Sequence, residues 1–408
     1  MPFIRFGLNL LLAVAVACSL ASSWPAGPAF DALVQAPQQN RSRSFGPGQC
    51  GPVDPVYIQM ANETGGQPFF MNPLEVADSA HIIRETSHSN SEMVLWASST
   101  TPNEAREFAV PVDSTIVRLT FSASFDVKGG DLTILGPKGM ASGRDDRTED
   151  TISSCSRVVT VEAPASGTWQ ARLSATGRFW LVVHARSELS LLSAEFVRLG
   201  GRPGHEGLFR IAGQPVAGEP ATLRARVTDA DTLKRVTFAL HAQDGRELRH
   251  IDLTASGDEE FVGRVDLPQQ PFRVAVSGLD ASGLSFQRMH AGLFHAESVE
   301  VTPTGIVDAI APGTTATLTF AVRNVGPRAS FQIVAVDGRQ FVKHVEPQVI
   351  AVDSGAVGVV NVSVSVPADV PAGSSVDVTV TATGNSPRKP SNGTTRHLTI
   401  GPERFPQY

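Results

Sequence analysis

Val117-Arg-Leu-Thr-Phe-Ser-Ala-Ser-Phe125 alternates apolar side chains with polar or small ones. Successive side chains of an extended chain point to opposite faces, so this period of two predicts a β-strand with one buried face. Strand-like stretches recur after it, at residues 131–135, 158–161, 169–173 and 179–183. Turn-forming segments separate them, and this spacing predicts a β-sandwich, which we assign to residues 92–200.

The alternation continues beyond a glycine-rich break at Gly200-Gly-Arg-Pro-Gly204. It is clearest in these groups: Leu223, Ala225 and Val227; Val236, Phe238 and Leu240; Phe272, Val274 and Val276; Leu318, Phe320 and Val322; Val360, Val362, Val364 and Val366; Val376, Val378 and Val380. We predict two further sandwiches, residues 201–297 and 298–402. Both have immunoglobulin-like size, although neither carries the cysteine pair of that fold.

Residues 49–91 differ from the rest, with a predicted helix at 56–62, a Thr-Gly-Gly66 turn and a short strand at 68–71. A second helix is predicted from Asn72, which can cap it, to about Ile83. A piece of this size cannot bury enough surface to be stable alone, so we expect it to dock on its neighbour. The predicted fold class is mainly β: three tandem β-sandwich domains, jelly-roll-like and immunoglobulin-like, after a short α/β remnant.

The composition fits a folded chain of several domains. Its 408 residues exceed one ordinary hydrophobic core, and its 41% hydrophobic and 18% charged residues are near globular averages. Acidic residues outnumber basic ones by 40 to 34, so no net positive field favours phosphate backbones. Nucleic acid is therefore not an expected partner.

The first residues indicate export. Arg5 precedes an apolar run of signal-peptide length, and small residues follow, so we assign residues 1–23 to a signal peptide and 24–48 to a flexible linker. After its removal we expect no transmembrane segment, and a secreted, extracellular or cell-envelope location. The stretch around Cys18 also fits a bacterial lipoprotein cleavage site, in which Cys18 would carry the lipid anchor. In the alternative, Cys18 is only an apolar signal residue.

Two cysteines, Cys50 and Cys155, remain in the mature chain. In an oxidising compartment they allow one intramolecular disulfide, and two free or buried thiols are the alternative. No histidine stands beside either cysteine at zinc-ligand spacing, so a zinc site is not expected.

The segment from Asp54-Pro-Val-Tyr57 through Ala61-Asn-Glu-Thr-Gly-Gly-Gln-Pro-Phe-Phe70 resembles the end of a von Willebrand factor A domain. The sequence that follows resembles the region after that domain in hemicentins and in von Willebrand factor A domain-containing protein 7. The residues that carry this likeness are Val110-Pro-Val-Asp-Ser-Thr115, Leu132-Thr-Ile-Leu-Gly-Pro137, Gly167-Thr-Trp169, Pro271-Phe-Arg-Val-Ala-Val-Ser-Gly278 and Gly283-Leu-Ser-Phe-Gln-Arg288. It covers about residues 50–300, whereas the third sandwich is only generically similar to immunoglobulin-like folds.

The chain departs from that family because most of the A domain is absent, including the Asp-x-Ser-x-Ser motif that holds a divalent cation there. No metal or other site residue therefore carries over. The resemblance implies an extracellular adhesive or matrix-like setting.

No motif for catalysis was found. The sequence has neither a Gly-x-Ser-x-Gly elbow nor a His-Glu-x-x-His zinc motif. We interpret scattered histidines such as His81, His88 and His205 as structural or solvent-exposed, and the acidic pair Glu259-Glu260 as a solvated surface. The prediction is that the chain is not an enzyme.

Two weak candidates for ligand binding remain. The acidic loop at residues 145–150, with Asp126 and Asp131, could offer oxygen ligands to calcium, although a soluble turn is the simpler interpretation; no other cofactor is expected. Trp169 and Phe179 are expected in the core, which leaves Trp180 as the plausible surface platform for a sugar ring.

Four asparagines fit the N-glycosylation pattern: Asn40, Asn62, Asn361 and Asn392. Asn361 alternates with the inward Val360 and Val362, so it should face outward. The pattern matters only in a eukaryotic secretory route.

These features together favour a secreted, non-enzymatic structural or adhesion protein that presents β-sandwich surfaces to extracellular proteins or glycans. The alternative is a carbohydrate- or ligand-binding module of the cell envelope.

Overall fold

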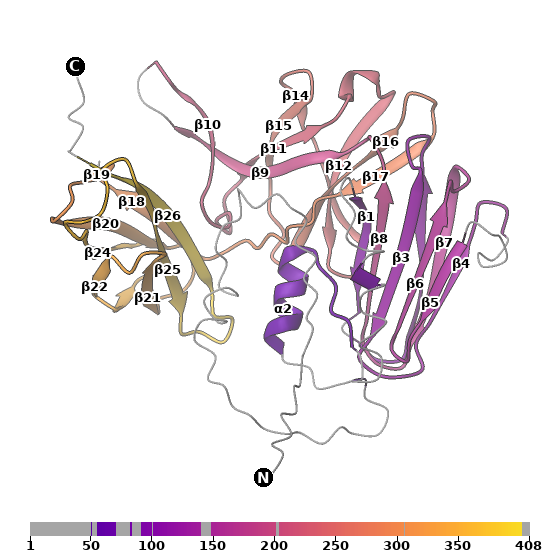
Figure 1. Ribbon diagram of the computed structural model, residues 1–408, viewed down its shortest axis with the longest axis horizontal. Helices are drawn as coiled ribbons and strands as arrows, with labels where there is room; N and C mark the ends of the chain where they lie inside the picture. The colour runs from indigo at the N-terminus through magenta and orange to yellow at the C-terminus, as the bar shows by residue number, and fades with distance from the viewer. Residues whose placement is uncertain are drawn as a thin grey trace, which may run out of the picture.

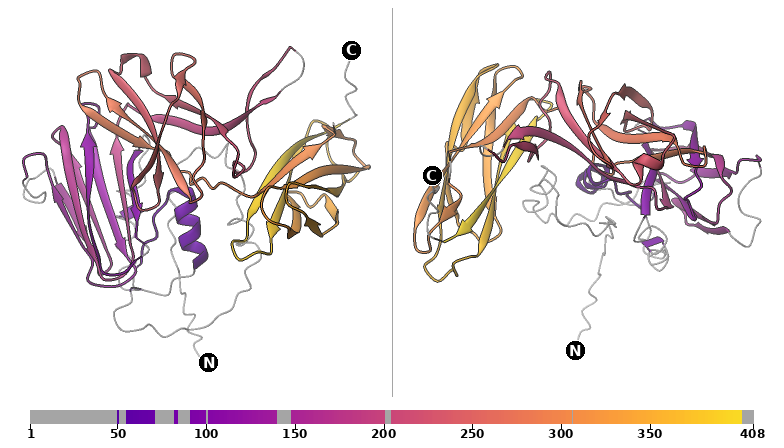
Figure 2. Two further views of the ribbon diagram at one scale, coloured as in Figure 1. Left: turned by 180° about the vertical axis from the view of Figure 1, so that it is seen from behind. Right: turned by 90° about the horizontal axis from the view of Figure 1, so that it is seen from above.

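The computed structural model describes residues 50, 55–70, 82–83, 91–99, 101–139, 148–200, 204–305 and 307–401. Within these residues the chain is mainly β, as the sequence predicts, with six sheets that pack as three pairs. Figure 1 shows the three pairs following one another along the molecule, and Figure 2 shows the last pair at one end, apart from the other two.

The first sandwich packs the sheet β1-β8-β3-β6-β5 on the sheet β2-β7-β4. Its strands are β1 (Ser91–Ser98), β2 (Glu104–Val112), β3 (Arg118–Phe125), β4 (Asp131–Leu135), β5 (Thr148–Ile152), β6 (Ser156–Glu162), β7 (Gly167–Ala175) and β8 (Phe179–Arg186). Leu119, Phe121 and Ala123 of β3 are fully buried in its core.

Two details of the alternating stretch differ from the prediction. Val117 is 54% exposed, because the chain bends before β3 and places Ile116 in the core instead. The polar face of β3 is also buried, since Thr120, Ser122 and Ser124 are at most 3% exposed. An N-terminal segment covers this face.

The second sandwich packs β10-β9-β11-β15-β14 on β13-β12-β16-β17. Its strands are β9 (Leu191–Gly200), β10 (Gly207–Arg210), β11 (Ala221–Val227), β12 (Arg235–Ala242), β13 (Glu247–Ile251), β14 (Thr254–Ala255), β15 (Glu260–Val265), β16 (Phe272–Leu279) and β17 (Ser285–Met289), with a 3-10 turn at Ala230–Thr232. The sequence places residues 191–200 in the first sandwich, but β9 pairs with β10 and β11 and contributes Phe196 to the second core. The glycine-rich break lies in the β9–β10 hairpin.

The third sandwich packs β18-β20-β24-β22 on β19-β26-β25-β21-β23. Its strands are β18 (Val299–Thr304), β19 (Ala309–Ile310), β20 (Thr315–Asn324), β21 (Ala329–Asp337), β22 (Val342–Glu346), β23 (Val349–Val352), β24 (Val357–Ser365), β25 (Ser375–Gly384) and β26 (Ser391–Ile400). The predicted alternation is confirmed on β24 and β25, where Val360, Val362, Val378 and Val380 are fully buried.

The segment before the first sandwich contains α2 (Pro55–Thr64), which confirms the predicted helix. Gly65 adopts a left-handed φ of 75° at the turn after it. The predicted strand at 68–71 is wrong as far as residue 70, because this stretch pairs with no sheet in the described chain. The predicted helix from Asn72 lies outside the described residues, apart from Ile82 and Ile83, which are helical.

Candidate functional site

The N-terminal segment, residue 50 with residues 55–70, docks across the first and second sandwiches. A buried apolar cluster joins Ile58 and Phe70 of this segment to strands of both sandwiches, including Trp96 of β1 and Met289 of β17. We call the two sandwiches together with this segment the body. The expected docking of the α/β remnant is therefore present, and it covers two sandwiches rather than one.

Polar side chains fix the segment on the sheet. Gln67 is 7% exposed, and its Nε2 donates to the Ser122 carbonyl (3.1 Å) and the Trp180 carbonyl (3.2 Å). Ser124 Oγ donates to the Pro68 carbonyl at 2.6 Å, and Trp96 Nε1 donates to the Gly66 carbonyl at 3.2 Å. These bonds satisfy backbone groups of a stretch that has no sheet partner.

A disulfide joins Cys50 to Cys155, with Cα atoms 5.9 Å apart, and both residues lie in the same buried cluster. Cys50 begins the N-terminal segment, and Cys155 lies in the turn between β5 and β6. The bond therefore fastens the segment to the first sandwich and closes a long stretch of chain.

Arg273 of β16 is fully buried beneath α2. Its guanidinium donates to the carbonyls of Ala291 and Asn62 and lies 4.3 Å from the centre of the Trp96 ring. Because Asn62 belongs to the last turns of α2, the cation faces the negative end of the helix dipole. Burial lowers the pKa of Arg273 to about 9, so it remains charged at neutral pH.

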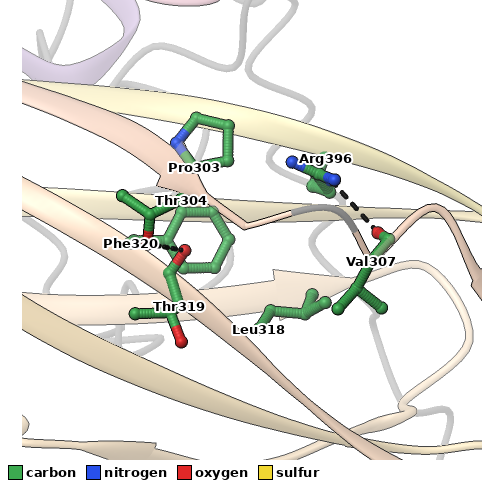
Figure 3. A pocket seen from close by; sticks show the side chains of 7 residues that line it. All are labelled: Pro303, Thr304, Val307, Leu318, Thr319, Phe320 and Arg396. Carbon is green, nitrogen blue, oxygen red and sulfur yellow. Dashed lines mark hydrogen bonds between the residues drawn. The ribbon is translucent and has the colours of Figure 1, made fainter.

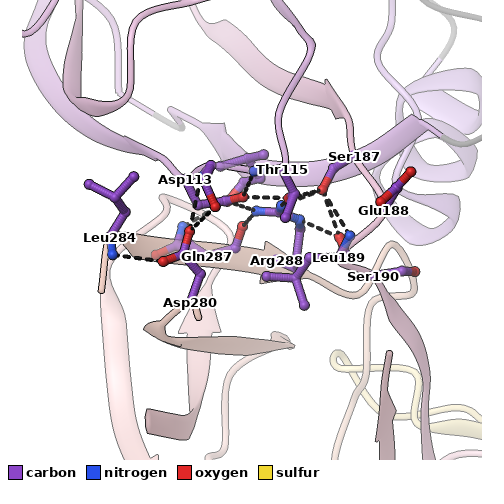
Figure 4. Close-up of polar contacts among 12 residues, drawn as sticks. Asp113, Thr115, Ser187, Glu188, Leu189, Ser190, Asp280, Leu284, Gln287 and Arg288 are labelled. Atoms are coloured by element: carbon purple, nitrogen blue, oxygen red, sulfur yellow. Dashed lines mark hydrogen bonds and ion pairs between the residues drawn. The ribbon is translucent and has the colours of Figure 1, made fainter. Parts of the chain in front are cut away.

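Arg288 of β17 forms the second buried contact of the body (Figure 4). Its Nη1 lies 2.8 Å from Asp113 Oδ2, with both side chains fully buried. Its Nη2 donates to Ser187 Oγ at 2.6 Å, and its Nε donates to the Leu189 carbonyl at 2.8 Å. The cation from the second sandwich is thus enclosed by acceptors at the edge of the first.

A further polar contact lies beside this ion pair. Asp280, in the turn between β16 and β17, accepts from the backbone N–H (2.9 Å) and the Oγ (2.6 Å) of Ser114 in the first sandwich. Its other carboxylate oxygen accepts from the Leu284 N–H at 2.7 Å, which shapes the turn itself. Both buried arginines and Asp280 therefore serve the junction between the first two sandwiches.

The junction between the body and the third sandwich is built around Asn392 of β26, which is 4% exposed. Its Nδ2 donates to the carbonyls of Gln214 and Val299, both at 2.9 Å, and its Oδ1 accepts from the Gln214 N–H at 2.8 Å. None of the four buried apolar clusters of the described chain contains residues of both the body and the third sandwich.

Charged side chains bridge the rim of this junction. Arg323 of β20 pairs with Glu219 of the body (2.7 Å) and with Glu300 of β18 (2.8 Å). Glu300 also pairs with Arg198 of β9. These groups keep contact with solvent, so each pair contributes little, about 0–1 kcal/mol.

Glu297 lies in the linker just before β18, and its Oε2 accepts from the Ser391 N–H at 3.1 Å. Burial raises the pKa of Glu297 to about 7. The hydrogen bond from the Ser391 N–H lowers this pKa, and the nearby Glu63 carboxylate raises it. Burial also raises the pKa of Glu63 and lowers that of His295.

The expected surface role of Trp180 is wrong. The side chain is 2% exposed, its Nε1 donates to Asn62 Oδ1 at 3.0 Å, and its ring packs 5.4 Å from that of Phe70. The strand pattern predicts that this face of the sheet is exposed to solvent, but the N-terminal segment covers it. Trp169 and Phe179 are buried in the core, as predicted.

The four sequon asparagines lie in different surroundings. Asn361 is exposed between the buried Val360 and Val362, as predicted. Asn392 is unsuited to a glycan because both hydrogens of its amide are donated inside the junction. Asn62 is half-buried with its Oδ1 bound to Trp180, and Asn40 lies outside the described residues.

The acidic candidates for calcium pair with arginines where they are described. Asp126 pairs with Arg178 at 2.8 Å, and Arg157 lies 2.7 Å from Asp150 and 3.6 Å from Asp131. Residues 145–147 lie outside the described chain, and the described part holds no cluster of three or more metal-ligating side chains. Glu259 pairs with Arg226 at 3.0 Å, and His205 is exposed.

Two small recesses lie on the described surface. One of about 10 Å³ lies in the third sandwich between Phe320 and Arg396 (Figure 3), and one of about 70 Å³ lies beside Phe125 and Arg157 in the first. In the third sandwich the exposed apolar side chains Val349, Val357 and Val359 lie on β23 and β24. No helix of the described chain is long and apolar enough to cross a membrane.

Sequence reasoning missed Arg273, Arg288, Asp113, Glu297 and the junction role of Asn392. One available signal was an arginine inside an otherwise apolar alternating strand, as in Phe272-Arg-Val-Ala-Val276. Such a residue needs acceptors once the strand is buried.

The fold therefore defines a chain of tandem β-sandwiches joined at two polar junctions. Residues 299–402 match the family described as the VWA7 Ig-like domain, so the third sandwich has a more specific relationship than the generic one expected from its sequence. The von Willebrand factor A domain-containing protein 7 of Mus musculus is 25% identical over 233 residues, which cover 56% of this chain and 25% of the mouse protein.

Two solved structures share parts of the β architecture at low similarity. The Bacillus licheniformis lipase BlEst2 in its propeptide form has a TM-score of 0.27 and 13% identity over 51% of this chain and 44% of the lipase. Salmonella alpha-2-macroglobulin reacted with methylamine has a TM-score of 0.26 and 10% identity over 77% of this chain and 32% of its own. Neither likeness carries a functional argument.

Proposed function

We propose that this chain is an exported, non-enzymatic structural or adhesion protein whose sandwich surfaces bind other extracellular proteins. The observation that carries the proposal is the match of the third sandwich to an immunoglobulin-like domain family. Domains of this architecture act through exposed surfaces and loops rather than through a deep cleft. The small recesses of the described chain support this interpretation.

Export is supported by the apolar N-terminal run and by the Cys50–Cys155 disulfide, because such bonds persist in oxidising compartments. We propose cleavage after residue 23 and sandwich boundaries between β8 and β9 and just before Val299. In a bacterial host the lipid anchor at Cys18 remains the alternative. An adhesive, matrix-like setting rests on the resemblance to hemicentins.

The carbohydrate-binding alternative is not proposed again, because it depended on Trp180, which is buried. In a eukaryotic secretory route we propose that Asn361 carries a glycan and that Asn392 does not. Asn361 offers an exposed amide, whereas a glycan on Asn392 would break the junction.

The test begins with the full chain expressed with its own N-terminus. We expect the protein outside the cytosol with a new N-terminus at residue 24, or at Cys18 if it is lipidated. Unprocessed chain in the cytosol would contradict export.

The purified exported protein is then coated on a surface and exposed to extracellular-matrix proteins, with soluble chain as competitor. We expect saturable, competable binding, and its absence would contradict adhesion. Val357→Lys with Val359→Lys, compared with the matched exposed Val117→Lys, asks whether the third sandwich makes the contact.

A further inference from the structure

The junction between the body and the third sandwich has the features of a hinge. The linker at residues 295–298 enters β18 there, and the contacts across it are hydrogen bonds and ion pairs. In the described chain the buried apolar cluster of the third sandwich contains only residues of that sandwich. Apolar burial gives most of the adhesion between packed domains, and this junction has no shared buried cluster of the kind that joins the first two sandwiches.

Glu297 is the carboxylate of this junction that has no basic side chain paired with it in the described chain. Its backbone is fixed by the body, because its N–H donates to the Pro215 carbonyl and its carbonyl accepts from the Ala217 N–H, at 2.9 and 2.8 Å. Its carboxylate meets the third sandwich through the Ser391 N–H. It forms no ion pair with a described basic side chain, whereas Glu219 and Glu300 of the same junction both do.

The surrounding charged groups do not supply the missing cation. Glu63 approaches from the last turn of α2, with its carbonyl bound to the Leu293 N–H. Arg273 of β16 is occupied by two carbonyls and the Trp96 ring. Burial lowers the pKa of His295, in the linker itself, and it lowers the pKa of His290, which stacks on Phe294, to about 4.

We propose that this junction is a proton-controlled hinge, in which the third sandwich is docked on the body while Glu297 is protonated and is released when Glu297 is ionised. The proposal goes beyond adhesion as such, because it concerns the orientation of the sandwiches and not what they bind.

The direction of the pH dependence follows from the pKa of Glu297 in the docked and in the open state. The pKa of Glu297 is about 7 when docked and near its ordinary 4.5 when the carboxyl is hydrated, so the docked state binds the extra proton. The docking equilibrium therefore weakens as pH rises through 7. This difference between the two pKa values corresponds to a change of about 300-fold in the docking equilibrium constant between pH values well below 4.5 and well above 7.

His295 limits how far docking strengthens as the pH falls. Burial lowers the pKa of His295, so its protonation in the open state opposes docking as pH falls below its ordinary value of 6.5. Arg273, with a pKa of about 9, keeps its charge throughout. Docking therefore weakens as pH rises through 7, and the protonation of His295 in the open state opposes docking in acid.

The test uses the full mature chain with dyes at the exposed positions Ala255→Cys in the body and Ser354→Cys in the third sandwich. Energy transfer between the dyes and the radius of gyration from X-ray scattering are measured from pH 5.5 to 8.5. We expect separation of the dyes and a larger radius above pH 7.5. A constant distance across this range would overturn the proposal.

Two variants separate the hinge from general effects of pH. Glu297→Gln mimics the protonated carboxyl at the same size, so it should remain docked from pH 6 to 8.5. Glu219→Gln is the matched control, because this carboxylate lies at the same junction but is paired with Arg323, and it should keep the pH response. A Glu297→Gln chain that still opens, or a Glu219→Gln chain that no longer responds, would overturn the assignment. Unchanged far-ultraviolet circular dichroism confirms that each variant is folded.

Discussion

The two junctions of this chain join similar sandwiches by different chemistry. Between the first and second sandwiches lie two fully buried arginines, the carboxylates of Asp113 and Asp280, and an apolar cluster to which α2 contributes. Between the second and third, an asparagine, an uncompensated glutamate and exposed ion pairs make the contact. In this chain, the two sandwiches that share a buried apolar cluster are the two on which the N-terminal segment also packs.

The largest expected effect comes from the disulfide. Replacing Cys50 and Cys155 together by serine should lower the free energy of unfolding of the body by up to about 4–5 kcal/mol, because the bond closes a loop spanning 105 residues. Denaturant unfolding followed by tryptophan fluorescence measures it, since Trp96, Trp169 and Trp180 all lie in the first sandwich. Mass spectrometry of unreduced peptides provides the direct check, and free thiols at both positions would refute the pairing.

Arg288→Met should cost about 3–5 kcal/mol, because it leaves Asp113 buried without its cation. The double variant Arg288→Met with Asp113→Leu should recover part of this loss. Arg323→Met at the other junction is the matched control, and it should cost no more than about 1 kcal/mol because Arg323 and Glu219 both keep contact with solvent. Equal losses at the two arginines would remove the distinction between the junctions.

Asn392→Ala should cost about 1–3 kcal/mol of docking free energy, since the backbone carbonyl and N–H of Gln214 in the body both lose their partner. X-ray scattering should show a more extended chain, while tryptophan fluorescence of the body stays unchanged. A compact Asn392→Ala chain would show that other contacts hold the third sandwich.

The smallest effect is expected at Asn361→Ala, which should change stability by less than about 0.5 kcal/mol because the side chain is exposed. In protein from a eukaryotic secretory host, this variant should lose one glycan. Glycopeptide mass spectrometry that finds Asn392 occupied instead would contradict the proposed site.

The sequence predicted the sandwiches because a period of two is a local property of each strand, as β24 and β25 show. It could not predict what covers a strand. Ser122, Ser124 and Trp180 read as solvent-facing, yet all three lie beneath the N-terminal segment. That contact joins residues more than 50 positions apart, as in the bond of Gln67 to Ser122, and no local pattern encodes it.

The candidate site was harder to predict for the same reason. A sequon marks Asn392 as a glycan acceptor, but its role depends on Gln214, which lies 178 residues away. The boundary at residue 200 was misplaced because a glycine-rich hairpin resembles a linker in sequence. Arg288 lies inside β17 in an ordinary strand pattern, and only the fold reveals that Asp113 faces it.

The central claim is that the first two sandwiches and the N-terminal segment unfold as one unit, separately from the third. Hydrogen exchange of the full chain, read by mass spectrometry across a denaturant series, tests it most directly. Peptides from β3, β16 and α2 should lose protection at the same denaturant concentration, and peptides from β25 at a different one. Loss of protection in β16 together with β25 but apart from β3 would contradict the account.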